Sequence, residues 1–172
     1  MSLDTEILKD FIHESKNLIQ ESCVILGEVE ENIRQASKLD EYGNLVDRIM
    51  GGAKNIALML PPAHALHLVS SYAELCKAVG YKTSQITNNE QFFNVCVALL
   101  QDATETLDRL LDNLDKHPDD LRKTLPEAFI ERLRWISNKF NDDYRASVNT
   151  KKASQKSMDQ NEIDALIKKM GL

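Results

Sequence analysis

The stretch EQFFNVCVALLQDATETLDRLLDNL, residues 90–114, carries the strongest periodicity in the chain. Its apolar side chains recur at steps of three and four residues, which places them along one face of an α-helix. Asn88 or Asn89 can cap this helix at its N-terminus, and Pro118 follows its end. A core-facing helix is therefore predicted here. Its inward positions are Phe92, Phe93, Cys96, Leu99, Leu100, Ala103, Leu107, Leu110, Leu111 and Leu114.

The sequence before this stretch has two more segments with the same pattern. A long helix is predicted over the first 33 residues, with Val24 in its apolar stripe, and a polar break follows at SKLDEYGN, residues 37–44. A second helix is predicted over residues 45–60, where Pro61 and Pro62 stop it.

Two further helices complete the expected fold. One covers residues 63–79, with Gly80 as the residue just past its C-terminus. The other begins at Thr124, because Thr124-Leu125-Pro126-Glu127 matches a capping box, and it buries Phe129, Leu133, Ile136 and Phe140. Four to five such helices with short connections predict an antiparallel bundle.

Composition supports one all-α domain. The chain has 172 residues, of which 42% are apolar, so it can bury one sizeable core. Only 6 Gly, 4 Pro and 6% aromatic residues leave little material for the turns and faces of a β-rich domain. The predicted fold class is an all-α antiparallel bundle over residues 1–140 with a flexible C-terminal tail.

Charge and cysteine content exclude several classes of function. A net charge of -6 disfavours nucleic acid or an anionic membrane as partner, because both select for clustered Lys and Arg. Cys23, Cys76 and Cys96 are widely spaced without metal-ligand spacing, so each is expected to be a buried thiol and no metal site is expected. With no signal peptide or membrane-spanning run, a cytoplasmic protein is predicted.

The C-terminal part changes character. Residues 141–157, NDDYRASVNTKKASQKS, contain almost no apolar side chains and predict a flexible linker. Residues 158–172 regain a helical pattern, with Ile163, Leu166, Ile167 and Met170 on one side. A segment this short is not a stable helix alone, so it is expected to fold against a partner.

The order and lengths of the predicted helices resemble the histidine phosphotransfer (HPt) domain of CheA-type chemotaxis kinases. In that family the second helix carries a phosphorylated His in a pattern resembling R-x-x-H-x-x-K-G. This chain has Arg48 and Lys54, but Gly51 stands at the position of the His and Asn55 at that of the Gly. Neither residue offers a nucleophile, so the resemblance implies an HPt-like domain without phosphotransfer at this position.

The tail resembles the CheY-binding C-terminal peptide of CheZ phosphatases, and its Glu-Ile-Asp-Ala-Leu core is also similar to the CheY-binding N-terminus of FliM. The resemblance implies a docking helix whose apolar face enters a groove while its acids meet basic residues at the rim. The alternative is a helix that caps its own bundle. The implied partner-binding residues are Asp159, Gln160, Glu162, Ile163, Asp164, Leu166, Ile167, Met170 and Leu172.

CheZ-like enzymes hydrolyse the aspartyl phosphate of CheY. The resemblance implies that the receiver supplies Mg²⁺, while the phosphatase adds an acid for the receiver's lysine and an amide that orients water. Gln101, Asp102 and Thr104 align with the family's Gln-Asp-Leu-Thr-Gly-Gln stretch, and Thr106 stands at the position of the water-orienting Gln. The implied catalytic residues are Asp102, Thr106 and Gln101; alternatively, the acids of this helix form a solvated face.

A second candidate face lies on the HPt-like helix. Asp47, Gly51, Lys54 and Asn55 share one side of that helix, opposite its apolar stripe. Asn55 is placed to orient water and Asp47 to pair with the receiver's lysine. Gly51 and the adjacent Gly52 leave room for a phosphorylated loop, or else they mark a tight helix crossing.

Together, these resemblances imply a chemotaxis signalling protein that binds phosphorylated CheY through its C-terminal peptide and promotes hydrolysis of the aspartyl phosphate. The alternative is a non-catalytic CheY-binding adaptor or sink. No cofactor bound by this chain is expected, because Mg²⁺ comes from the receiver. The long apolar stripes on the first and fourth helices are also compatible with a homodimer.

Overall fold

The computed structural model describes residues 3–144 and 160–171, and within them the chain forms helices and no strands. The predicted all-α fold is thereby confirmed. The elements are α1 (Leu3–Val29), the 3-10 helix η1 (Ile33–Lys38), α2 (Leu39–Ala57), α3 (Ala65–Thr83), α4 (Glu90–Leu111), α5 (Pro118–Arg122), α6 (Glu127–Tyr144) and α7 (Gln160–Lys169).

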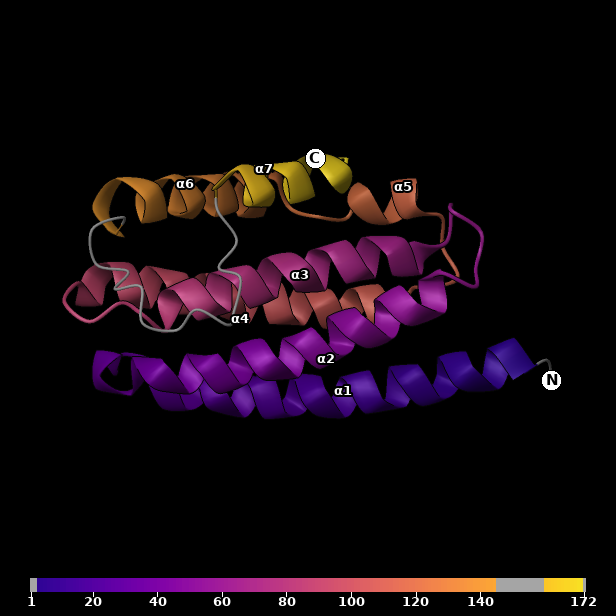
Figure 1. The fold of residues 1–172 in the computed structure, drawn as a ribbon, viewed down its shortest axis with the longest axis horizontal. Helices are drawn as coiled ribbons and strands as arrows, with labels where there is room; N and C mark the ends of the chain where they lie inside the picture. Colours follow the sequence, from indigo (N-terminus) through magenta and orange to yellow (C-terminus); the bar gives the residue numbers. More distant parts are fainter. Residues whose placement is uncertain (1–2, 145–159, 172) are drawn as a thin grey trace.

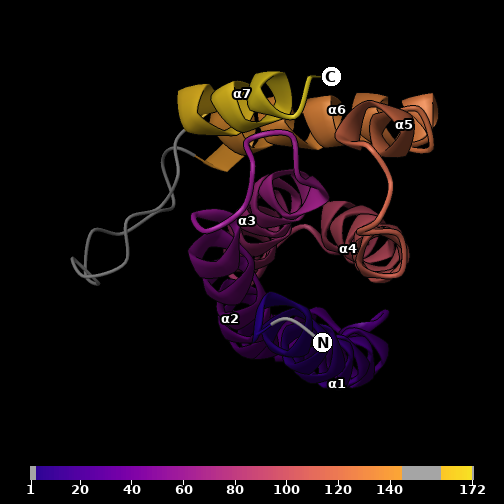
Figure 2. The same cartoon turned by 90° about the vertical axis from the view of Figure 1, so that its right-hand side faces the viewer.

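The helices form two layers. α1 to α4 run alternately up and down along one long axis, and α5, α6 and α7 lie across α3 and α4 as a second layer (Figure 1). In the end-on view α2 and α4 flank α3 on different sides, and α1 closes the bundle below them (Figure 2). The antiparallel bundle expected from the sequence is present.

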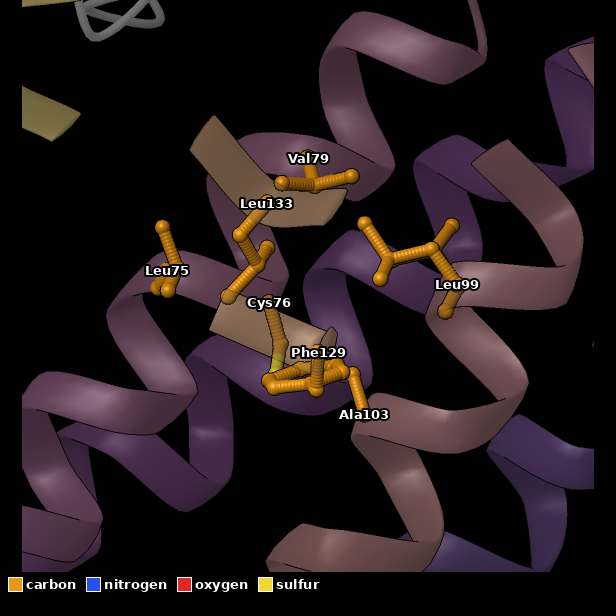
Figure 3. Close-up of a pocket in the computed structure, with 8 residues that line it drawn as sticks. Leu75, Cys76, Val79, Leu99, Ala103, Phe129 and Leu133 are labelled. Carbon is orange, nitrogen blue, oxygen red and sulfur yellow. The ribbon is translucent and has the colours of Figure 1, made fainter. Parts of the chain in front are cut away.

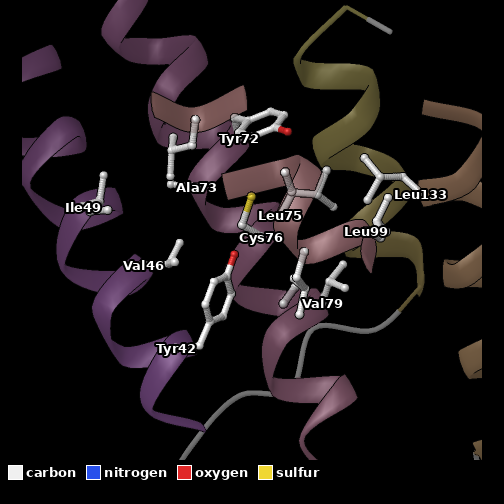
Figure 4. Close-up of a cluster of buried hydrophobic side chains, with 14 of the residues drawn as sticks. Tyr42, Val46, Ile49, Tyr72, Ala73, Leu75, Cys76, Val79, Leu99 and Leu133 are labelled. Carbon is white, nitrogen blue, oxygen red and sulfur yellow. The ribbon is translucent and has the colours of Figure 1, made fainter. Parts of the chain in front are cut away.

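The core is built from the periodic apolar positions. All ten inward positions predicted in residues 90–114 are buried. Asn89 caps α4, since its Oδ1 accepts a hydrogen bond of 2.9 Å from the backbone N–H of Phe92. Side chains of α2, α3 and α4 meet in one cluster, in which Tyr42 of α2 points towards Cys76 (Figure 4).

Tyr42 joins three helices. Its ring packs on α3 at Gly80, where an added Cβ would lie 2.7 Å from the tyrosine Cδ1. Its hydroxyl is 3.0 Å from Oγ1 of Thr104 on α4. Because the Thr104 hydroxyl already donates to the carbonyl of Leu100, Tyr42 is the donor in this contact. The tyrosine is fully buried, so this hydrogen bond is made inside the core.

A second tyrosine repeats the packing in the opposite direction. The ring of Tyr81 on α3 covers Gly43 on α2, and a Cβ added to Gly43 would lie 2.5 Å from its Cε1. The two glycines therefore let α2 and α3 approach closely where the start of α2 meets the end of α3. Any larger residue at either position would push a tyrosine ring out of place.

This packing overturns two boundaries expected from the sequence. The predicted break between helices at residues 37–44 is wrong, because α2 begins inside this stretch, at Leu39. The prediction that a helix ends just before Gly80 is also wrong, because α3 continues to Thr83. In both places the glycine provides space for a facing ring and does not end the helix.

Three smaller expectations also fail. Val24 is 62% exposed, so it lies outside the apolar stripe of α1. The Thr124 hydroxyl donates to the carbonyl of Leu121 at 2.6 Å and forms no capping box with α6. The first four residues of the predicted linker 141–157 belong to α6, and residues 145–157 lie outside the described part of the chain.

Within the described ranges, no helix is both long and apolar enough to cross a lipid bilayer.

Replacing Gly80 with alanine tests the packing between α2 and α3. The new methyl group would overlap a buried ring, so Gly80→Ala should lower the free energy of unfolding by about 1–3 kcal/mol, as measured by urea denaturation. Gly27→Ala is the matched control, because Gly27 also lies inside a helix but nothing is within 4 Å of its added Cβ. The control should gain about 0.5–1 kcal/mol. Equal gains in the free energy of unfolding from both variants would contradict the close packing of Tyr42 on Gly80.

Candidate functional site

The candidate site on α4 is divided between solvent and core. Asp102 is exposed, and its Oδ2 lies 3.3 Å from the guanidinium of Arg132 on α6. Thr106 is only 4% exposed, and its hydroxyl donates to the carbonyl of Asp102 at 2.9 Å. The same Oγ1 accepts a hydrogen bond of 3.0 Å from Arg109. This geometry gives no support to a water-orienting role for Thr106; Gln101, beside Asp102, is half-buried.

The other acids of α4 are partly neutralised. Lys16 of α1 contacts Asp108 at 2.9 Å and Asp112 at 2.8 Å. These two carboxylates raise the pKa of Lys16 against the opposing effect of its burial, so the ammonium stays charged. The acidic face of α4 therefore helps hold α1 in the bundle, which is a structural role for acids that the sequence suggested were only solvated.

The candidate site on α2 is open to solvent. Lys54 and Asn55 are exposed, and within the described part of the chain neither has an ion pair or a side-chain hydrogen bond. Asp47 differs, because its Oδ1 lies 2.6 Å from the ammonium of Lys77 on α3. Asp47 and Asn55 are eight residues apart, about 12 Å along the helix axis. The acid and the amide therefore do not meet at one point.

The two adjacent glycines of α2 have different surroundings. A Cβ added to Gly52 would lie 2.9 Å from the ring of Phe11 on α1, so this glycine allows a tight helix crossing. A Cβ added to Gly51 would have nothing within 4 Å. Both explanations left open by the sequence are thus present, one at each glycine: close packing at Gly52 and free space at Gly51.

The exposed surface around Gly51 carries basic side chains on α2 and becomes apolar at the C-terminal end of this helix. We define the α2 face as Arg48, Gly51, Lys54, Asn55 and Leu58. Arg48 pairs with Glu14 of α1 at 2.9 Å through side chains that are more than half exposed, so the pair is weak and exchangeable. Leu58 is 77% exposed. The sequence analysis did not predict the apolar end of this face. The signal that could have revealed it is Leu58, an apolar residue outside the buried stripe of the helix.

The C-terminal helix lies on its own bundle. α7 packs against α3 and α6, beside α6 in the second layer (Figures 1 and 2). Its four predicted apolar residues are all buried. This is the alternative arrangement named from the sequence, a helix that caps its own bundle, so the predicted docking face is covered. Asp164 is exposed, whereas Asp159, Leu172 and the side chains of Gln160 and Glu162 lie outside the described residues.

A gap between α3, α4 and α6 has no room for a water molecule. It is lined only by apolar side chains, among them Leu75, Cys76 and Phe129 (Figure 3). Burial raises the pKa of Cys76 to about 12, so its thiol is not a nucleophile at neutral pH. Cys96 is buried too, with a pKa of about 12, whereas Cys23 is exposed and its predicted burial is wrong.

Three comparisons with known proteins give the same result. No family model matches this chain, and neither the curated proteins nor the solved structures contain a match.

A charge placed under α7 should release this helix. Ile167 is buried, and a ten-residue helix is marginal in isolation, so Ile167→Glu should expose the backbone amides of α7. We expect their hydrogen-exchange protection to fall by about tenfold or more, because removing a buried isoleucine costs about 2–5 kcal/mol. Ala165→Glu adds the same charge at an exposed position of the same helix. This control should keep its protection; equal loss in both variants would contradict a docked α7.

Proposed function

We propose that this chain is a chemotaxis signalling protein that binds a phosphorylated CheY-type receiver through the α2 face. The observation that carries the proposal is the free space at Gly51. A glycine inside a helix costs about 1 kcal/mol relative to alanine, and no neighbour in the described chain requires one there. Close approach of a partner is a physical reason for its presence.

The chemistry beside Gly51 fits an anionic partner. Lys54 is three residues along the helix and Asn55 four, so both lie within about 6 Å of Gly51 along the axis. An unpaired ammonium can neutralise an aspartyl phosphate, and an unpaired amide can donate to it. Gly27 on α1 is equally unhindered. However, the cation beside it, Lys38, is already paired with the neighbouring Glu28.

The shape of the bundle agrees with the resemblance to HPt domains. α1 to α4 form an antiparallel four-helix bundle, and α2 carries an exposed face between α1 and α3. In the family that the sequence resembles, this is the helix that docks receivers. The exposed Leu58, and Met59 at 65% exposure, add apolar area at one end of the same surface.

A non-catalytic adaptor is the form of this function that the geometry supports best. Asp47 is engaged by Lys77 and lies about 12 Å along the axis from Asn55. Thr106 is buried and already hydrogen-bonded. Neither candidate face therefore brings a free acid and a water-orienting group together.

Phosphatase activity is the second candidate, because one observation favours it. The amide of Asn55 is exposed, has no partner in the described chain, and lies one turn from Gly51. A receiver supplies its own Mg²⁺ and most of the charge stabilisation, so a single amide that orients water would accelerate hydrolysis. No cofactor of this chain is needed for either function.

Filling the space at Gly51 should weaken receiver binding without harming the fold. We expect Gly51→Leu to raise the Kd for the phosphorylated cognate receiver by about tenfold or more, because the new side chain obstructs the approach of the partner. Isothermal titration calorimetry with the full-length chain measures this. Gly27→Leu is the matched control, since it adds the same side chain to another unhindered helix position, and it should bind like the unchanged protein.

Two results would count against the proposal. If Gly51→Leu binds the receiver with unchanged affinity, the α2 face is not the docking site. If only Ile167→Glu loses binding, the C-terminal helix is the docking site. The same samples separate adaptor from enzyme. Substoichiometric protein accelerates dephosphorylation only if it turns over, and Asn55→Ala should abolish that acceleration while leaving the Kd within about twofold.

A further inference from the structure

A polar pocket lies at the junction of α4 and α5. These two helices are on a different side of the bundle from α2 (Figure 2). Its volume is about 180 Å³, which corresponds to roughly six water molecules at liquid density. The candidate faces described above contribute only Thr106 to it. The lining residues are Thr106, Arg109, Leu110, Asn113, Lys116, Leu121 and Thr124.

The first three lining residues follow from the helix period. Thr106, Arg109 and Leu110 are spaced i, i+3 and i+4, so they share one side of the last turns of α4. Asn113 follows in the turn after the helix, where its backbone N–H donates to the carbonyl of Leu110. The chain then turns back, and the segment after it contributes Leu121 and Thr124 from the facing side. Two leucines thus provide an apolar base, and the polar groups surround it.

The hydrogen bonds in the pocket leave donors free. Arg109 uses one N–H on the hydroxyl of Thr106 at 3.0 Å, which orients its guanidinium and leaves four further N–H groups. Asn113 uses one amide N–H on the carbonyl of Arg109 at 2.7 Å and retains the other. Both threonine hydroxyls donate to backbone carbonyls. The free donors therefore belong to Arg109, Asn113 and Lys116.

Charge in the pocket is opposite in sign to that of the whole chain. The net charge is -6, yet neither Arg109 nor Lys116 has a carboxylate partner in the described residues. Most acids nearby are engaged elsewhere: Asp108 and Asp112 contact Lys16, Asp119 contacts Arg122, and Asp120 contacts Lys123. Asp115 has no ion pair in the described residues, but it does not line the pocket. A helix C-terminus attracts cations, but that attraction explains neither the pocket nor its free donors.

We propose that this pocket binds a small phosphate-type oxyanion, inorganic phosphate or the phosphoryl group of a phosphomonoester, through Arg109, Lys116 and the amide of Asn113. Guanidinium and ammonium groups form charge-assisted hydrogen bonds to phosphate oxygens. The pocket has room for one tetrahedral oxyanion together with some of its water.

Titration of the full-length ¹⁵N-labelled chain with potassium phosphate tests the site. At constant ionic strength, we expect saturable amide shifts concentrated in residues 106–124. Arg109→Gln and Lys116→Gln should each weaken binding by about tenfold or more, since each removes a charged hydrogen-bond donor. Lys116 is exposed and makes no side-chain hydrogen bond or ion pair in the described chain, so we expect Lys116→Gln to keep the fold even if Arg109→Gln disturbs Thr106.

Lys123→Gln is the matched control. Lys123 is exposed and pairs with Asp120 outside the pocket, so its variant should bind phosphate like the unchanged protein. A parallel titration with phenyl phosphate separates the two sources: tighter binding than phosphate identifies an ester, and weaker binding identifies free phosphate. Linear shifts that chloride reproduces, or equal affinity in all three variants, would overturn the proposal.

Discussion

The fold depends on the contact in which Tyr42 crosses Gly80 and donates to Thr104. This contact ties α2 to α3 and α4 at once, and the hydroxyl that makes it is buried in the core. Burial raises the pKa of Tyr42 well above its ordinary value, so the phenol stays neutral and remains a donor. The reciprocal contact of Tyr81 with Gly43 sets how closely α2 and α3 approach, and with it the orientation of the α2 face.

Periodicity predicted the helices well and their ends poorly. The apolar positions of residues 90–114 are all buried and Asn89 is the cap, because burial and capping are local consequences of the sequence. Gly80 was interpreted as a helix end, although its role is to accept a ring from α2. Such a contact depends on residues about forty positions apart, which no local pattern records. Val24 failed for a different reason: the buried stripe of α1 runs through Ser22, Ile25, Leu26 and Val29, and Val24 lies off that stripe.

The candidate sites show the same division. Helix spacing alone was enough to predict that Asp47, Gly51, Lys54 and Asn55 share one face. Only the tertiary structure shows that Lys77 pairs with Asp47. It also shows that the space beside Gly51 is open while Gly52 packs against α1. The apolar face of α7 was predicted correctly, but its site of burial was not. In this account α7 stabilises the second layer, and the α2 face stays available while α7 is docked.

The most direct test of this account is to map the surface that the phosphorylated receiver covers. Hydrogen exchange of the full-length chain, alone and saturated with phosphorylated receiver, measures this for each helix. We expect new protection over residues 47–59 on α2 and unchanged protection on α7. Protection gained on α7 with increased exchange on α3 and α6, and no change on α2, would contradict the account, because it would show the C-terminal helix leaving the bundle to bind the receiver.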